Sequence, residues 1–162
     1  FIAIFLGYSI GSAPIISFHY GAKNNCELKN LFKKSLSLIG SWGIMLFIIA
    51  QIISGPLAKL FVGYNAELFV MTKHGFQIFC FAFLINGFNI FGSSFFTALN
   101  NGLISAAISF LRTLVFQLSV VLILPMILGI NGIWISVAIA ELLTLCVTVT
   151  CLIRKRKVYH YI

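Results

Sequence analysis

The sequence predicts an all-α polytopic membrane protein, and three observations lead to this fold class. Of the 162 residues, 60% are hydrophobic and only 9% are charged, whereas about 25% of a soluble domain is charged. Apolar segments long enough for a helical span of about 20 residues follow one another along the chain. They are too long and too uniformly apolar for alternating barrel strands of about 10 residues. The composition also excludes a soluble globular domain and intrinsic disorder.

Five transmembrane helices are expected, in chain order. The first starts at Phe1 with no basic segment before it, so we interpret it as a helix cut within a membrane span and not as a signal peptide. A polar, basic stretch (21–34) precedes the second, and a short loop (61–74) precedes the third. Asn-Asn-Gly at 100–102 and the Gly-Ile-Asn-Gly turn at 129–132 bound the fourth. The expected spans are residues 1–20, 35–60, 75–99, 103–128 and 133–153, followed by a basic tail at 154–162.

The basic residues predict the orientation of these spans. The net charge is +8, and eight basic residues fall on one side of the expected membrane, against Lys59 and Lys73 on the other. The positive-inside rule then places the C-terminus in the cytoplasm and the chain in the plasma or inner membrane. Clusters that flank apolar spans indicate contact with a lipid bilayer and do not indicate a nucleic-acid partner. The eight are Lys23, Lys29, Lys33, Lys34, Arg154, Lys155, Arg156 and Lys157.

Polar residues in the third span recur at helical spacing. Such a stripe lines an aqueous or substrate cavity, or it supplies interhelical hydrogen bonds. Both interpretations produce the same pattern. The residues are Asn86, Asn89, Ser93, Thr97 and Asn100.

Two charged residues lie inside the fourth and fifth spans, where an unpaired charge is costly. Arg112 could extend to the cytoplasmic surface, pair with an acid or contact a ligand. Glu141 could relay protons, bind a cation or neutralise Arg112. Counted from the cytoplasmic side at about 1.5 Å per residue, the two differ by only about 3 Å in depth. We therefore expect a pair or a shared hydrogen-bond network, with an extended Arg112 and a cavity-facing Glu141 as the rival. The face predicted for Arg112 also carries Ser105, Ser109 and Ser119. The face predicted for Glu141 also carries Trp134, Thr144 and Thr148.

The remaining features predict packing and not catalysis. Small residues in the first span indicate a face for close helix packing. The four cysteines form no CxxC pair and show no metal-ligand spacing, and no phosphate-binding loop, nucleophile motif or carboxylate pair is present. We expect no enzyme activity, no cofactor and no metal site. The small residues are Gly7, Ser9, Gly11 and Ser12.

Four segments, in order, resemble the multidrug and toxic compound extrusion (MATE) transporters. Residues 11–23 (GSAPIISFHYGAK) resemble that family's PIISYNYGA signature. Residues 95–99 (FFTAL) resemble the FxALG stretch that ends its tenth helix. Residues 108–112 (ISFLR) resemble xSLLR in the eleventh, and residues 132–141 (GIWISVAIAE) resemble GxWxxxPxAE in the twelfth. The details look most like the bacterial MepA-like branch.

The resemblance implies a C-terminal fragment of a twelve-helix, two-lobe transporter, running from the eighth helix to the twelfth. It also implies export of hydrophobic or cationic compounds in exchange for H⁺ or Na⁺. Where the NorM branch of the family has a sodium-binding Asp, this sequence has Asn89. Asn100 and Ala138 replace a usual Gly and Pro. The resemblance leaves a lipid-linked oligosaccharide flippase open, and a non-transporting membrane subunit is a further alternative.

Overall fold

The structure, a computed structural model, describes residues 1–161, and within this range every regular element is a helix. Five helical stretches are long and apolar enough to cross a membrane. The all-α polytopic fold class is therefore confirmed. The elements are α1 (Ile2–Gly21), α2 (Asn25–Val62), α3 (Ala66–Phe79), the 3₁₀ turn η1 (Cys80–Ala82), α4 (Phe83–Ala98), α5 (Gly102–Phe110), the π-helix η2 (Leu111–Gln117), α6 (Leu118–Leu128) and α7 (Ile130–Tyr159).

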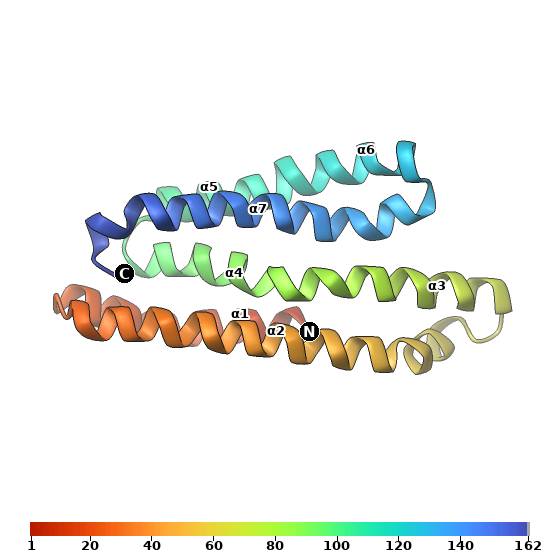
Figure 1. The fold of residues 1–162 in the computed structure, drawn as a ribbon, viewed down its shortest axis with the longest axis horizontal. Helices are drawn as coiled ribbons and strands as arrows, with labels where there is room; N and C mark the ends of the chain where they lie inside the picture. The colour runs from red at the N-terminus through yellow and green to blue at the C-terminus, as the bar shows by residue number, and fades with distance from the viewer. Residues whose placement is uncertain (162) are drawn as a thin grey trace.

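The continuous stretch α3–η1–α4 runs through the middle of the bundle (Figure 1). Helices α1 and α2 pack on one side of it. On the other side α5 and α7 pack against α4, and η2 and α6 pack along α7. Because α4 contacts α1, α2, α5 and α7, its side chains supply much of the interior. Large apolar side chains cover the outside of the other helices, as expected for faces that meet lipid tails.

Two stretches expected as loops are mostly helical. The polar stretch 21–34 is non-helical only around Ala22–Asn24, since the Asn24 side chain accepts the Glu27 N–H at 3.2 Å and caps α2. The loop expected at 61–74 shrinks to a turn at 63–65. Asn65 accepts the N–H groups of Glu67 and Leu68, at 3.0 and 3.1 Å, and caps α3. The caps and the acidic first turns stabilise helix starts that hydrophobicity alone does not mark.

The basic tail is also helical over most of its length. Helix α7 continues through the expected boundary at residue 153 to Tyr159, because Lys and Arg are good helix formers and are favourable near a helix C-terminus. His160 adopts a left-handed conformation (φ 54°) and ends the helix. The last residue of the expected tail, Ile162, lies outside the described residues.

Close helix packing is centred on α4, and on the expected small-residue face of α1 it includes Ser9 but not the glycines. A Cβ added at Gly7 or Gly11 would meet no atom within 4 Å, so that expectation is wrong for these two glycines. By contrast, a Cβ at Gly92 would collide with the Thr148 side chain of α7, and one at Gly87 would meet Phe5 at 2.6 Å. Glycine is required where α4 approaches its neighbours.

Candidate functional site

An ion pair joins η2 to α7 in the interior of the bundle. The Nε and Nη2 groups of Arg112 donate to Oε1 of Glu141 at 2.9 and 2.7 Å. The Glu141 side chain is only 4% exposed, and that of Arg112 is 24% exposed. The pairing expected from equal depth is therefore confirmed, and the rival with an extended Arg112 is wrong. Each charge compensates the other in a medium where either alone would be costly.

Two asparagines of α4 complete the network around this pair. Asn89 is fully buried and donates through Nδ2 to Oε2 of Glu141 at 2.7 Å and to its main-chain oxygen at 2.8 Å. Its Oδ1 accepts the Thr148 hydroxyl at 3.1 Å. Asn86 Oδ1 accepts Nη2 of Arg112 at 2.9 Å. Both carboxylate oxygens thus accept hydrogen bonds. Asn89 contacts Glu141, and Asn86 contacts Arg112.

Local backbone features bring these side chains together. The turn at Gly129 (φ 59°) reverses the chain so that α6 and α7 pack as neighbours. Arg112 lies in the π-helix η2, a rare conformation that is found frequently at functional sites. On α4, the absence of a side chain at Gly92 lets Thr148 come close enough to reach Asn89.

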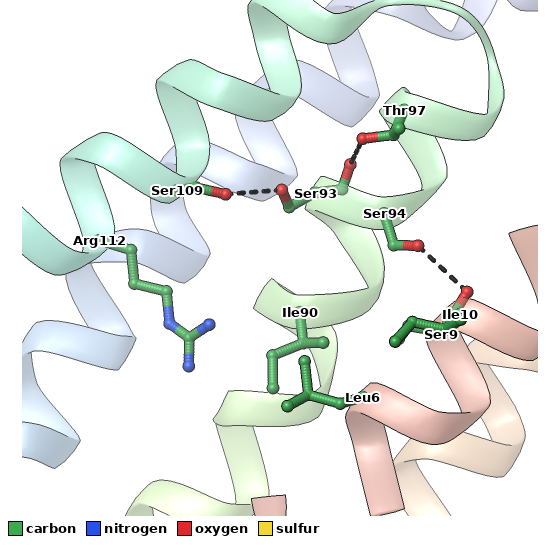
Figure 2. Close-up of a pocket in the computed structure, with 9 residues that line it drawn as sticks. All are labelled: Leu6, Ser9, Ile10, Ile90, Ser93, Ser94, Thr97, Ser109 and Arg112. Carbon is green, nitrogen blue, oxygen red and sulfur yellow. Dashed lines mark hydrogen bonds between the residues drawn. The ribbon is translucent and has the colours of Figure 1, made fainter. Parts of the chain in front are cut away.

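A hydroxyl-lined cavity of about 300 Å³ lies beside the network, between α1, α4 and α5–η2 (Figure 2). The Ser93 hydroxyl is within hydrogen-bond distance of those of Ser105, at 2.9 Å, and Ser109, at 2.8 Å. Thr97 donates to Ser105 at 2.7 Å. Arg112 reaches the cavity wall, so the buried ion pair and the cavity share one residue. The lining residues are Leu6, Ser9, Ile10, Ile90, Ser93, Ser94, Thr97, Ser109 and Arg112.

One cavity-lining hydroxyl has unused hydrogen-bonding capacity. Ser9 is 2% exposed, and its Oγ has no partner among residues 1–161. The Ser9 main-chain oxygen accepts the Ser94 hydroxyl at 3.1 Å, which ties α1 to α4 at the wall (Figure 2). A buried polar atom without a partner is costly, so this wall is suited to a ligand with a polar group.

The structure brings most of the predicted polar residues together and separates a few. Ser119 is exposed and does not join Arg112, because the π-helix between them breaks the 3.6-residue period on which their shared face was predicted. Asn100 is exposed in the turn after α4, at φ 59°. Trp134 packs against Gly75 of α3, away from Glu141. Sequence reasoning missed Ser94 and the wall from α1, since a contact between residues 85 positions apart leaves no local pattern.

The bundle, with its apolar outer faces and a buried charge network beside a polar cavity, defines a multi-pass membrane protein. Its fold is similar to the crystal structure of the Vibrio cholerae MATE transporter VcmN in the bent form, with a TM-score of 0.80 at 19% sequence identity. That match covers 94% of this chain and 36% of the Vibrio chain. The MatE family profile matches residues 1–123, and the chain belongs to the MatE family. No curated protein matches it.

The family resemblance expected from the four sequence segments is therefore confirmed at the level of the family. The MepA-like branch remains a prediction, as does the assignment of residues 1–162 to a C-terminal lobe. The chain spans about a third of the length of the solved transporter.

Proposed function

We propose that the chain is part of a secondary active exporter that moves hydrophobic or cationic compounds out of the cell by alternating access, in exchange for H⁺ or Na⁺. Membership of the MatE family supports the transporter class. The observation that carries the proposal is the buried Arg112–Glu141 pair, because Arg112 also lines the hydroxyl-lined cavity. In this proposal the C-terminus is cytoplasmic, as the positive-inside count predicts.

The cavity offers a substrate both apolar contact and neutral hydrogen bonds. Leu6, Ile10 and Ile90 supply apolar surface, while Ser93 and Thr97 supply hydroxyl groups. Glu141 balances the charge of Arg112, so the local net charge does not repel a cationic compound. This combination suits amphipathic molecules, which need apolar burial and a few polar contacts for orientation.

The coupling ion would act on the carboxylate of Glu141. A proton bound there removes the negative charge that holds Nε and Nη2 of Arg112. A sodium ion bound at the carboxylate would instead compensate its charge in place of the guanidinium. Either ion competes with Arg112 for Glu141, which links ion binding to the position of a cavity-lining side chain. The pathway residues in this proposal are Asn86, Asn89, Ser93, Thr97, Arg112 and Glu141.

Efflux of a fluorescent hydrophobic cation such as ethidium, measured in cells that express the full-length protein, tests the proposal. Asn86→Leu and Asn89→Leu should lower efflux at least tenfold while membrane abundance stays near that of the wild type. Asn30→Leu is the matched control, because Asn30 is exposed on α2 and makes no contact with the network. Abundance that falls in step with efflux would show that the asparagines only stabilise the bundle.

A further inference from the structure

An apolar groove runs along the outside of the bundle between α2 and α7. The backbones of these two helices stay apart, and α4 lies between them and packs against both (Figure 1). Phe88 of α4 is among the residues that line the groove. The groove has a volume of about 390 Å³, and every lining side chain is apolar. From Leu145 to Ile153 it follows α7 for about 12 Å. The lining residues are Phe32, Leu36, Phe88, Leu145, Val149, Leu152 and Ile153.

Basic residues continue both walls of the groove at the end where α2 begins and α7 ends. Lys29 lies three residues before Phe32 and seven before Leu36, and so shares their face of α2. Arg156 lies four residues after Leu152 and three after Ile153, and so shares their face of α7.

Acidic residues do not neutralise this end of the groove. Within residues 1–161 the only ion pair is that of Arg112 with Glu141, so no carboxylate in this range lies within 4.0 Å of Lys29 or Arg156. Glu27 lies five residues from Phe32, which turns it to the opposite side of α2. The mouth of an apolar groove is therefore positively charged.

The chain end after α7 fixes the two walls relative to each other. Tyr161 is fully buried, its ring lies 5.1 Å from that of Phe32, and its hydroxyl donates to the Leu152 main-chain oxygen at 2.7 Å. Phe32 and Leu152 are lining residues from opposite walls. The spacing at the charged end is thus held by a buried contact.

We propose that this groove is a binding site for an anionic phospholipid, with an acyl chain along the apolar walls and the headgroup phosphate between Lys29 and Arg156. The apolar walls suit a lipid tail, and the basic residues continue the same two helix faces where a headgroup would sit. Basic pockets between membrane helices bind anionic headgroups in this manner. By the positive-inside count, this end of the bundle is cytoplasmic. The site lies outside the cavity of the proposed transport function and does not depend on it.

Lipid retention by the full-length protein tests the proposal without any transport measurement. The protein is placed in nanodiscs with equal amounts of phosphatidylglycerol and phosphatidylcholine of the same acyl chains, extracted into mild detergent, and its bound lipids are quantified by mass spectrometry. The wild type should retain phosphatidylglycerol preferentially. The double variant Lys29→Gln/Arg156→Gln should lower that preference about 25-fold, since each basic residue near an anionic lipid contributes roughly a factor of five.

A matched control removes the same charge from the same two helix ends. Lys34 lies two residues from both Phe32 and Leu36 and turns away from the groove. Arg154 follows Ile153 directly, but it lies five residues from Val149 and nine from Leu145, which turns it away from the α7 wall. Lys34→Gln/Arg154→Gln should keep the phosphatidylglycerol preference within about threefold of the wild type. If the two double variants lose the phosphatidylglycerol preference equally, the preference arises from general surface charge and the proposed site is wrong. Equal retention of the two lipids by the wild type would overturn it as well.

The acyl-chain half of the proposal has its own variant. Val149 is 42% exposed in the groove wall, and Val149→Trp should fill the groove and lower the amount of phosphatidylglycerol retained. Leu143 is 40% exposed on another face of α7, so Leu143→Trp should leave retention unchanged. Retention that survives Val149→Trp would contradict a lipid tail in this groove.

Discussion

Arg112 and Glu141 meet at a single carboxylate oxygen, with Nε and Nη2 of the guanidinium both donating to Oε1 at 2.9 and 2.7 Å. The other oxygen, Oε2, is left to Asn89. The guanidinium therefore does not bind both carboxylate oxygens, because Oε2 accepts its hydrogen bond from Asn89 of α4. The guanidinium also donates to Asn86. The geometry makes the ion pair one part of a network across three helical elements.

The first prediction concerns the coupling between the two charges. Arg112→Met and Glu141→Gln should each destabilise the protein by about 3–5 kcal/mol, because each leaves a buried charge without its partner. The double variant should be less damaged than the sum of the two singles, with a coupling free energy of about 1–3 kcal/mol. Thermal unfolding in detergent and membrane abundance measure this cycle. Additive losses would mean that the pair seen in the structure contributes no energetic coupling.

The second prediction concerns the close approach of α4 to α7. Gly92→Ala should cost about 1–3 kcal/mol, since the added methyl group collides with the Thr148 methyl group and displaces the hydroxyl that donates to Asn89. Adding Thr148→Ser should restore most of the stability, because serine keeps the hydroxyl and lacks the methyl group. Thermal unfolding temperatures of the single and double variants report the rescue.

Gly11→Ala is the control for this prediction. A Cβ at Gly11 meets open space, so this substitution should be neutral or stabilise the helix by up to about 1 kcal/mol. Losses of similar size at Gly11 and Gly92 would argue against a specific contact with Thr148.

The sequence predicted the number and order of the helices because hydrophobicity changes sharply at the membrane-spanning segments. It could not predict that α2 begins at Asn25 or that α7 reaches Tyr159, since those turns are polar and depend on a cap or on the helix dipole. The expected span limits therefore differ from the helix ends where the helix extends beyond the apolar segment, as at the basic stretch before residue 35.

The pairing of Arg112 with Glu141 was predictable because depth in the membrane follows from counting residues, and both charges need a partner. The π-helix was not predictable from the pattern of polar residues, and it removed Ser119 from the expected face. The wall of the cavity formed by Ser9 and Ser94 depends on how α1 packs on α4, which no local spacing encodes.

The third prediction concerns topology. A cysteine at Asn25 should react only with a membrane-impermeant thiol reagent added from the cytoplasm, and a cysteine at Tyr64 only from outside, because the basic residues lie eight against two on the two sides. Both positions are exposed. Native Cys26 is exposed beside Asn25 and must be replaced by serine first. The opposite labelling pattern would show that the predicted orientation is wrong and that the C-terminus is not cytoplasmic.

The last prediction concerns the ion that we propose acts on Glu141. In Asn89→Asp, an oxygen replaces the amide nitrogen that now lies 2.7 Å from Oε2 and 2.8 Å from the main-chain oxygen of Glu141. Three oxygen atoms would then face one another with no hydrogen between them. Two carboxylates at this distance cannot both remain ionised without a proton or a bound cation. The variant should therefore change the ion dependence of efflux relative to the wild type, either by strengthening a requirement for Na⁺ or by steepening the response to external pH.

Asn89→Leu separates this effect from the simple loss of hydrogen bonds. It removes the same contacts to Glu141 and Thr148 without adding a charge, so it should lower efflux without changing its ion dependence. Ethidium efflux at several Na⁺ concentrations and external pH values, normalised to membrane abundance, distinguishes the two variants. If Asn89→Asp is abundant and its ion dependence equals that of the wild type, Asn89 does not occupy a coupling position, and the network around Glu141 is structural.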